Sequence, residues 1–151
     1  MSVKKLYLAS PWFNENQKKT MDKIYNILLF EKFDVFAPFY NGLVVNKNND
    51  SLETRKKAFD INVCSIDDCS LVVAVIDDWD SGTMFEIGYA YKSGIPVLGY
   101  SDVNGRGLNL MLQMAVWGFA NGDEELKNQL SRFKNGVESN NYYSFINGDV
   151  V

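Results

Sequence analysis

The 151-residue chain contains no histidine. This absence excludes Ser-His-Asp and Cys-His nucleophile systems, His-based zinc sites and the usual general base at neutral pH. Acid–base or covalent chemistry therefore has to use carboxylates, tyrosine, lysine or a cysteine. With 19 aspartates and glutamates in the chain, carboxylates are the first candidates.

Cysteine is scarce, and the chain has only Cys64 and Cys69. A separation of five residues on one predicted helix points the two side chains away from each other, so we expect no disulfide between them. The spacing is not that of a CxxC motif and indicates neither a redox nor a zinc site. We interpret both cysteines as small buried apolar side chains in a reducing cytosol.

Long apolar runs are also absent. None reaches the ~18 residues of a membrane-spanning helix, and the first run, which ends at Ala9, is too short for a signal-peptide core. The net charge of −4 argues against binding to nucleic acid or an anionic membrane, which needs clustered lysine and arginine. We therefore expect one cytoplasmic domain, residues 1–151, that binds neither nucleic acid nor membrane.

The apolar pattern predicts alternating strands and helices. The run 71–76 is apolar at every position and largely β-branched, which is typical of a strand covered on both faces. Strands are expected at 4–9, 34–37, 71–76, 96–100 and 116–119, and helices at 14–31, 51–68, 83–93, 108–115 and 123–133. This order predicts an α/β fold, an open parallel sheet of about five strands with helices on both faces, flavodoxin-like or Rossmann-like.

Two further segments need an explanation. Residues 41–50, rich in asparagine and aspartate, are long for a connection inside a compact domain, so we treat them as a candidate lid or binding loop. The tail at 140–151 carries aromatic and aliphatic side chains. We expect this tail to pack on its own domain or on a neighbouring subunit.

Four acids follow the central apolar strand, namely Asp77, Asp78, Asp80 and Glu86. Sites in open α/β sheets lie beyond the carboxyl ends of the strands. We expect Glu86 in the first turn of the next helix, where the helix dipole favours a carboxylate and hence a nucleophile or charge stabiliser. The alternative is a set of solvated loop acids with Glu86 as a partner of the dipole. Gly88 weakens this alternative, since a helical glycine costs about 1 kcal/mol unless a neighbour must come close.

Other known motifs do not fit. Gly105 and Gly107 lack the third glycine of a dinucleotide fingerprint, and the chain has no Walker sequence. A response-receiver domain needs an acidic pair after the first strand, and a flavodoxin needs a hydroxyl-rich phosphate loop there. This chain has Ala9-Ser10-Pro11 at that place.

Taken together, the sequence resembles the nucleoside 2-deoxyribosyltransferase family. The matching pieces are LYLA at 6–9 with Trp12-Phe13, Asp60, DSGTMFEIGYA at 80–90 and Asn109-Leu-Met111. They extend over residues 6–118 in the order and approximate spacing of the family. The resemblance implies a retaining transfer in which Glu86 attacks the anomeric carbon of a 2′-deoxynucleoside and expels the base. A second base then attacks the deoxyribosyl ester.

The resemblance also implies roles for polar side chains. Tyr7 would position the nucleophile, and Asp60 and Asp80 would hold the base and help protonate its leaving nitrogen. Without the resemblance, Tyr7 is equally well a core tyrosine and Asp60 an exposed helix acid beside Arg55.

Further residues are implied to contact substrate. Trp12, Phe13 and Gly82 would line the site, with Phe13 stacking on the base. Asn109 and Met111 would reach the hydroxyls of the sugar bound in the site of an adjacent subunit. The terminal carboxylate of Val151 would also reach the sugar site of a neighbour. The alternatives are core packing for Phe13, a helix cap for Asn109 and a core position for Met111. These six residues are Trp12, Phe13, Gly82, Asn109, Met111 and Val151.

We therefore expect an enzyme of nucleotide salvage that exchanges bases between 2′-deoxyribonucleosides. Its partners would be 2′-deoxyribonucleosides and free nucleobases, with no metal ion and no cofactor, in a symmetric homo-oligomer such as a hexamer with shared active sites. One alternative is a hydrolase of 2′-deoxynucleoside 5′-phosphates, and another is a non-catalytic nucleotide-binding module. Residues 39–54, which should cover the base, match no recognisable pattern, so base preference stays open.

Overall fold

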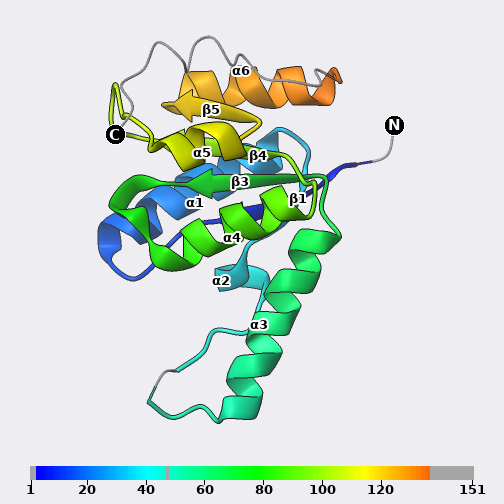
Figure 1. Ribbon diagram of the computed structural model, residues 1–151, viewed down its shortest axis with the longest axis vertical. Helices are drawn as coiled ribbons and strands as arrows, with labels where there is room; N and C mark the ends of the chain where they lie inside the picture. Colours follow the sequence, from blue (N-terminus) through cyan, green and yellow to red (C-terminus); the bar gives the residue numbers. More distant parts are fainter. Residues whose placement is uncertain (1–2, 47, 137–151) are drawn as a thin grey trace.

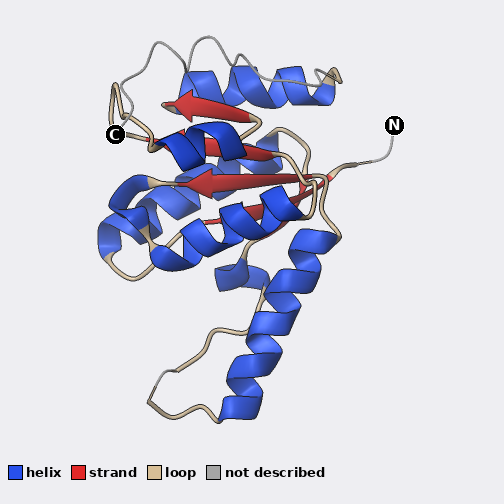
Figure 2. Cartoon of the chain, in the orientation of Figure 1, coloured by secondary structure: helices blue, strands red, loops and turns tan. Residues whose placement is uncertain are grey.

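A computed structural model of the chain describes residues 3–46 and 48–136. Its five strands form one parallel sheet in the order β2-β1-β3-β4-β5 (Figures 1 and 2). Their bounds are β1 Lys5–Ala9, β2 Asp34–Phe36, β3 Leu71–Val75, β4 Val97–Ser101 and β5 Gly118–Asn121. The predicted open parallel α/β fold is confirmed. The predicted packing of the 140–151 tail concerns residues outside those described.

Helices alternate with the strands. They are α1 Glu15–Phe30, α2 Pro38–Asn41, α3 Leu52–Asp67, the 3₁₀ turn η1 Asp77–Trp79, α4 Ser81–Lys92, α5 Leu110–Ala115 and α6 Asp123–Lys134. The sequence did not predict α2 or η1, because such short elements show no periodicity. Pro38, expected only to end a strand, opens α2, where its fixed φ suits a first helical position.

The helices cover both faces of the sheet. One face packs against α1 and α6, and its buried side chains include Leu8, Ile24, Val73, Leu98 and Leu130. The opposite face packs against α3, α4 and the α5 region, and its buried side chains include Tyr7, Ile66, Val72, Ile87 and Leu108. Since β3 is buried along its whole length, the continuous apolar run is explained by cover on both faces.

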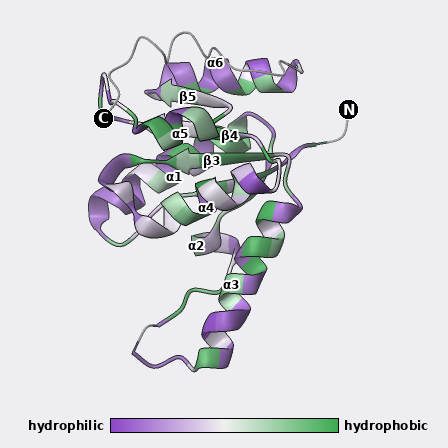
Figure 3. Ribbon diagram, in the orientation of Figure 1, coloured by the Kyte–Doolittle hydropathy of each residue, from purple (hydrophilic) through white to green (hydrophobic). Residues whose placement is uncertain are grey.

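The start of α3 and the loop before it extend away from the sheet (Figure 1). The loop begins with a hydrophobic stretch (green in Figure 3), in which Leu43 and Val44 are exposed. Leu52 and Phe59 are exposed apolar side chains on α3 itself. The described residues of the predicted lid, 41–46 and 48–50, do not line the cavity described below.

The two cysteines are both free, as predicted. Cys69 is half-buried and follows the end of α3. Cys64 is exposed, so its predicted burial is wrong: it lies on the side of α3 that the sheet does not cover. In the described part of the chain, no helix has the length and apolar character needed to cross a membrane.

Candidate functional site

The site lies at the carboxyl ends of β1 and β3, the two neighbouring strands in the middle of the sheet. From β1 the chain crosses to β2 on one side, and from β3 it crosses to β4 on the other. This reversal leaves a crevice between the two connections, which is the usual ligand position in open α/β sheets. The segments that leave β1 and β3 here begin at Ser10 and Ile76.

Helix α4 places the central carboxylate. Asp80 is its N-cap, and Oδ2 of Asp80 accepts hydrogen bonds from Thr83 N (2.9 Å) and Thr83 Oγ1 (3.0 Å). The helix therefore starts at Ser81, two residues earlier than predicted, because the cap lies upstream of Gly82. Glu86 consequently lies in the second turn, and its predicted place in the first turn is wrong.

Glu86 accepts a hydrogen bond from the hydroxyl of Tyr7 through Oε2, which joins α4 to β1. Tyr7 is fully buried, lies in the middle of its strand rather than at its end, and stacks on Phe36 with ring centroids 5.6 Å apart. Burial and the neighbouring Glu86 raise the pKa of Tyr7, so the phenol stays protonated and donates. Tyr7 is therefore a core side chain whose polar end contacts Glu86, and its role in positioning a nucleophile stays a prediction.

Burial raises the pKa of Glu86 from its ordinary value of 4.5 to about 7. The Tyr7 hydrogen bond lowers this pKa and the charge of Asp80 raises it, but desolvation is the largest effect. The expectation that the helix dipole decides the ionisation of Glu86 is therefore wrong, since desolvation raises its pKa. Beyond the first turn the dipole is weak, and loss of hydration decides the balance.

A cavity of about 230 Å³ adjoins Glu86. This volume lies below the roughly 300–1,000 Å³ of sites for drug-sized ligands, so it suits a nucleoside-sized group better than a dinucleotide. Its walls are mostly apolar and aromatic, with Trp12 against Phe13 and Phe59 against Phe85. The lining residues are Ser10, Trp12, Phe13, Pro38, Phe59, Asn62, Val63, Ile66, Asp80, Gly82, Phe85 and Glu86.

The structure thus brings six predicted site residues together. Trp12, Phe13, Asp80, Gly82 and Glu86 line the cavity, and Tyr7 lies behind Glu86.

Asp60 does not line this cavity, although the sequence predicted it at the base. The residues of α3 that do line it are Phe59, Asn62, Val63 and Ile66, with the spacing of one helix face. Asp60 lies outside that face and is exposed, which is the alternative that the sequence left open.

Asn109 and Met111 also lie outside the cavity of this chain. Asn109 caps α5, and its Oδ1 accepts a hydrogen bond from Met111 N at 2.8 Å, which confirms the helix-cap alternative. Met111 is 74% exposed, so the core alternative is wrong. Gly88 is equally open, since a Cβ there would meet no atom of the described residues within 4 Å. The close neighbour that we expected for Gly88 is not found among residues 3–46 and 48–136. Val151 lies outside the described residues.

Two of the four acids hold the surrounding loops. Asp77 accepts hydrogen bonds from Ser101 Oγ (2.6 Å) and Asp102 N (2.8 Å) and pairs with Arg106 at 3.2 Å. Asp78 accepts a hydrogen bond from Gln17 Nε2 at 3.0 Å. The alternative of a solvated loop acid is therefore wrong for Asp77, whereas Asp78 is exposed, as that alternative predicts.

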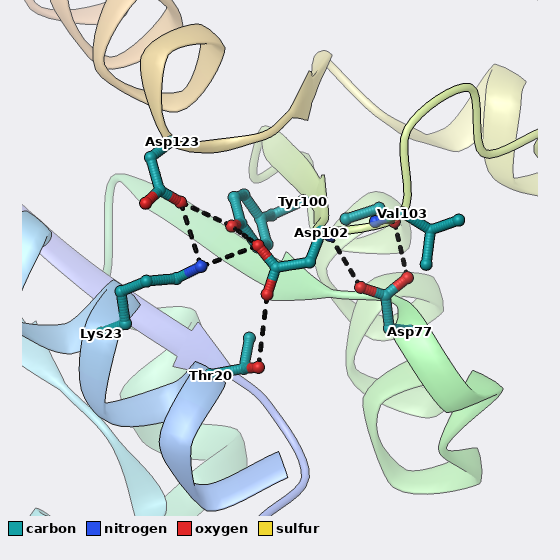
Figure 4. Close-up of polar contacts among 8 residues, drawn as sticks. Thr20, Lys23, Asp77, Tyr100, Asp102, Val103 and Asp123 are labelled. Carbon is teal, nitrogen blue, oxygen red and sulfur yellow. Dashed lines mark hydrogen bonds and ion pairs between the residues drawn. The ribbon is translucent and has the colours of Figure 1, made fainter. Parts of the chain in front are cut away.

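A polar network that the sequence did not predict joins α1, β4 and α6 beside Asp77 (Figure 4). Asp102 accepts hydrogen bonds from Lys23 Nζ (2.7 Å) and from the Tyr100 hydroxyl. The hydroxyl oxygen of Tyr100 also lies 2.6 Å from Asp123 Oδ1. Lys23 Nζ forms an ion pair with the same oxygen at 3.2 Å. Lys23 lowers the pKa of Asp102 against the effect of burial, so the aspartate stays charged. The network fixes the start of the β4–α5 connection that leads to Asn109.

Comparisons with known proteins identify the family of the chain. The family model described as nucleoside 2-deoxyribosyltransferase matches residues 6–113. A 2-deoxyribosyltransferase from Bacillus psychrosaccharolyticus is 31% identical, with a TM-score of 0.75 over 82% of this chain and 90% of its own. No curated protein sequence matches.

Two more distant structures share the fold. A conserved protein from Enterococcus faecalis V583 is 22% identical, with a TM-score of 0.70 over 87% of this chain and 99% of its own. A CMP N-glycosidase from Clostridium botulinum is 19% identical, with a TM-score of 0.54 over the same shares of the two chains.

Proposed function

Because the chain belongs to the nucleoside 2-deoxyribosyltransferase family, we propose that it exchanges bases between 2′-deoxyribonucleosides in nucleotide salvage. The observation that carries this proposal is the half-buried Glu86, which accepts a hydrogen bond from Tyr7 beside an aromatic cavity. Retaining glycosyl transfer requires a positioned carboxylate that can form and release a glycosyl ester.

The first half-reaction uses Glu86 as the nucleophile. An oxygen of the carboxylate attacks the anomeric carbon of the deoxyribose, and the bond to the base nitrogen breaks with its electron pair on the base. Tyr7 holds the carboxylate in place through its hydroxyl, which binds Oε2. The product is a neutral deoxyribosyl ester on Glu86, and a second base reverses the step.

Desolvation favours this ester. A carboxylate that has lost hydration is less stable than it would be in water, whereas the neutral ester has little hydration to lose. The pKa of about 7 records the same effect, since protonation also neutralises the carboxylate. The reactive form is the deprotonated one, so the proposal requires activity to rise as the pH passes through 7.

Asp80 supports the departing base. It lines the cavity, and its contacts to Thr83 use only Oδ2. The other oxygen is available to hold the base or to pass a proton to the leaving nitrogen. Phe13 and Trp12 supply flat apolar surface on which a base stacks.

A hydrolase of 2′-deoxynucleoside 5′-phosphates is the second candidate. A phosphate site usually contains arginine or lysine, or several free backbone N–H groups. Among the described residues, none of the side chains that line the cavity is basic. This composition favours a neutral nucleoside over a nucleotide.

We also propose a homo-oligomer with shared active sites. Leu110, Met111 and Met114 on α5 are exposed apolar side chains, and Phe85 and Gly88 are exposed on α4. Several exposed apolar side chains on two helices in contact are typical of protein contacts. In an oligomer, Asn109 would lie at the edge of the neighbour's site.

The test is to incubate the protein with deoxyinosine and free cytosine and to measure deoxycytidine by chromatography. The proposal expects deoxycytidine from the wild type and none from Glu86→Ala, with an unchanged circular dichroism spectrum. Release of free sugar without deoxycytidine would indicate a hydrolase. No turnover with any pair of nucleoside and base would leave the binding-module alternative.

A further inference from the structure

We propose that Asn62 is the residue that recognises the hydrogen-bonding edge of the nucleobase. The inference rests on the proposed function, since it assumes that the cavity beside Glu86 holds the base. Asn62 lies on α3 and lines the cavity together with Phe59, Val63 and Ile66 from the same helix. It is the polar member of this wall.

The other polar side chains of the cavity have partners. Ser10 Oγ donates to Pro11 O at 3.1 Å, Asp80 caps α4, and Glu86 is bound to Tyr7. Asn62 Oδ1 is buried and has no hydrogen-bond partner among the described residues. A buried acceptor without a partner costs free energy, and a ligand hydrogen bond would recover it when the amide turns its oxygen toward the cavity.

The surroundings hold Asn62 in place. A Cβ on Gly42 would lie 2.9 Å from Pro38 O and 3.0 Å from Asn62 Oδ1, so the end of α2 packs closely over this amide. Glycine at position 42 permits that approach. Asn62 is therefore placed by packing on two helices, as a side chain that recognises a ligand has to be.

The chemistry of the amide suits a base. Asparagine has one acceptor oxygen and two N–H donors, and rotation about its last torsion exchanges their positions. It can therefore pair with the amino group of one base or the carbonyl of another. The aromatic walls give mainly stacking, so hydrogen bonds to the base would come from Asn62 together with the second oxygen of Asp80, and only the amide of Asn62 offers both a donor and an acceptor.

The experiment compares the wild type with Asn62→Leu by calorimetric titration of adenine, hypoxanthine and benzimidazole. Benzimidazole keeps a fused ring system but lacks the polar substituents of the six-membered ring. We expect affinity for adenine and hypoxanthine to fall at least tenfold in Asn62→Leu, with benzimidazole affinity unchanged or higher. Asn128→Leu, an exposed position on α6, is the matched control and should change none of the three.

Other outcomes would overturn the proposal. Equal losses for all three ligands would indicate a packing role, and affinities within twofold of the wild type would show no contact. If Asn62→Leu does not fold, Asn62→Ser removes the amide with less bulk and should give the same selective loss. Base exchange in the wild type is measured in parallel. A selective loss without exchange would refute the proposed function alone, and exchange without a selective loss would refute only the role of Asn62.

Discussion

Replacing Glu86 with glutamine should make the protein more stable at high pH. Glutamine has nearly the same shape and still accepts the hydrogen bond from Tyr7, but it has no charge to desolvate. The wild-type carboxylate has a pKa raised from 4.5 to about 7 in the folded state. Since one pKa unit corresponds to about 1.4 kcal/mol, ionised Glu86 should destabilise the fold by about 3 kcal/mol.

The sign follows from linkage. Below pH 4.5 the carboxyl is protonated in both the folded and the unfolded chain, and its charge has no effect on stability. As the pH rises, the unfolded chain releases the proton first, so the free energy of unfolding falls until the pH passes about 7. Above that pH the loss is complete.

Urea denaturation at a series of pH values between about 4 and 9 measures this difference. Subtracting the wild-type free energy of unfolding from that of Glu86→Gln cancels the contributions of the other titrating groups. We expect the difference to grow by about 3 kcal/mol across the series. Glu53→Gln, which removes a charge from an exposed position on α3, is the control and should show no such growth. A difference independent of pH would refute the argument that burial raises the pKa of Glu86.

Three further predictions concern the same region. Tyr7→Phe removes the bond that lowers the pKa of Glu86, so the rise of kcat/KM with pH, expected near 7 in the wild type, should shift to higher pH; an unshifted profile would contradict the role of Tyr7. Asp80→Ala removes the cap of α4 and should lower the free energy of unfolding by about 1 kcal/mol, measured by urea denaturation, whereas Asp80→Asn, which also caps, should not. Met111→Glu places a charge on the exposed apolar surface and should reduce the mass found by light scattering; an unchanged assembly would mean that this surface is not the contact.

Much of the fold follows from local patterns. The apolar run ending at Ile76 predicts a strand with cover on both faces, and the structure has β3 there. Asn14 predicts the start of α1, and its side chain accepts a hydrogen bond from Gln17 N. Such signals act within a few residues, so a sequence pattern captures them. The predicted start of helix α4 was too late, because Gly82 was assigned to the loop. In the structure Asp80 caps the helix, which already includes Gly82.

The site was predicted less completely, because it depends on how helices pack. Tyr7 and Glu86 are 79 residues apart, and the resemblance to a family related them where periodicity could not. The resemblance also suggested Asp60, but the rotation of α3 directs Asn62 rather than Asp60 into the cavity. That rotation is set by contacts with α2 and α4, which no pattern within α3 encodes.

The hydrogen bond between Tyr7 and Glu86 also has a consequence for how the protein folds. It closes a loop of 79 residues and joins β1 to α4, the helix that follows β3. Strand β3 is itself paired with β1. Helices form within microseconds, whereas contacts between distant parts of a chain form late because loop closure costs entropy. After dilution from urea, helical circular dichroism should therefore recover before base exchange does. Under the proposed function, the contact between Tyr7 and Glu86 reports a late step of folding, since an active molecule is one whose central strands have already paired.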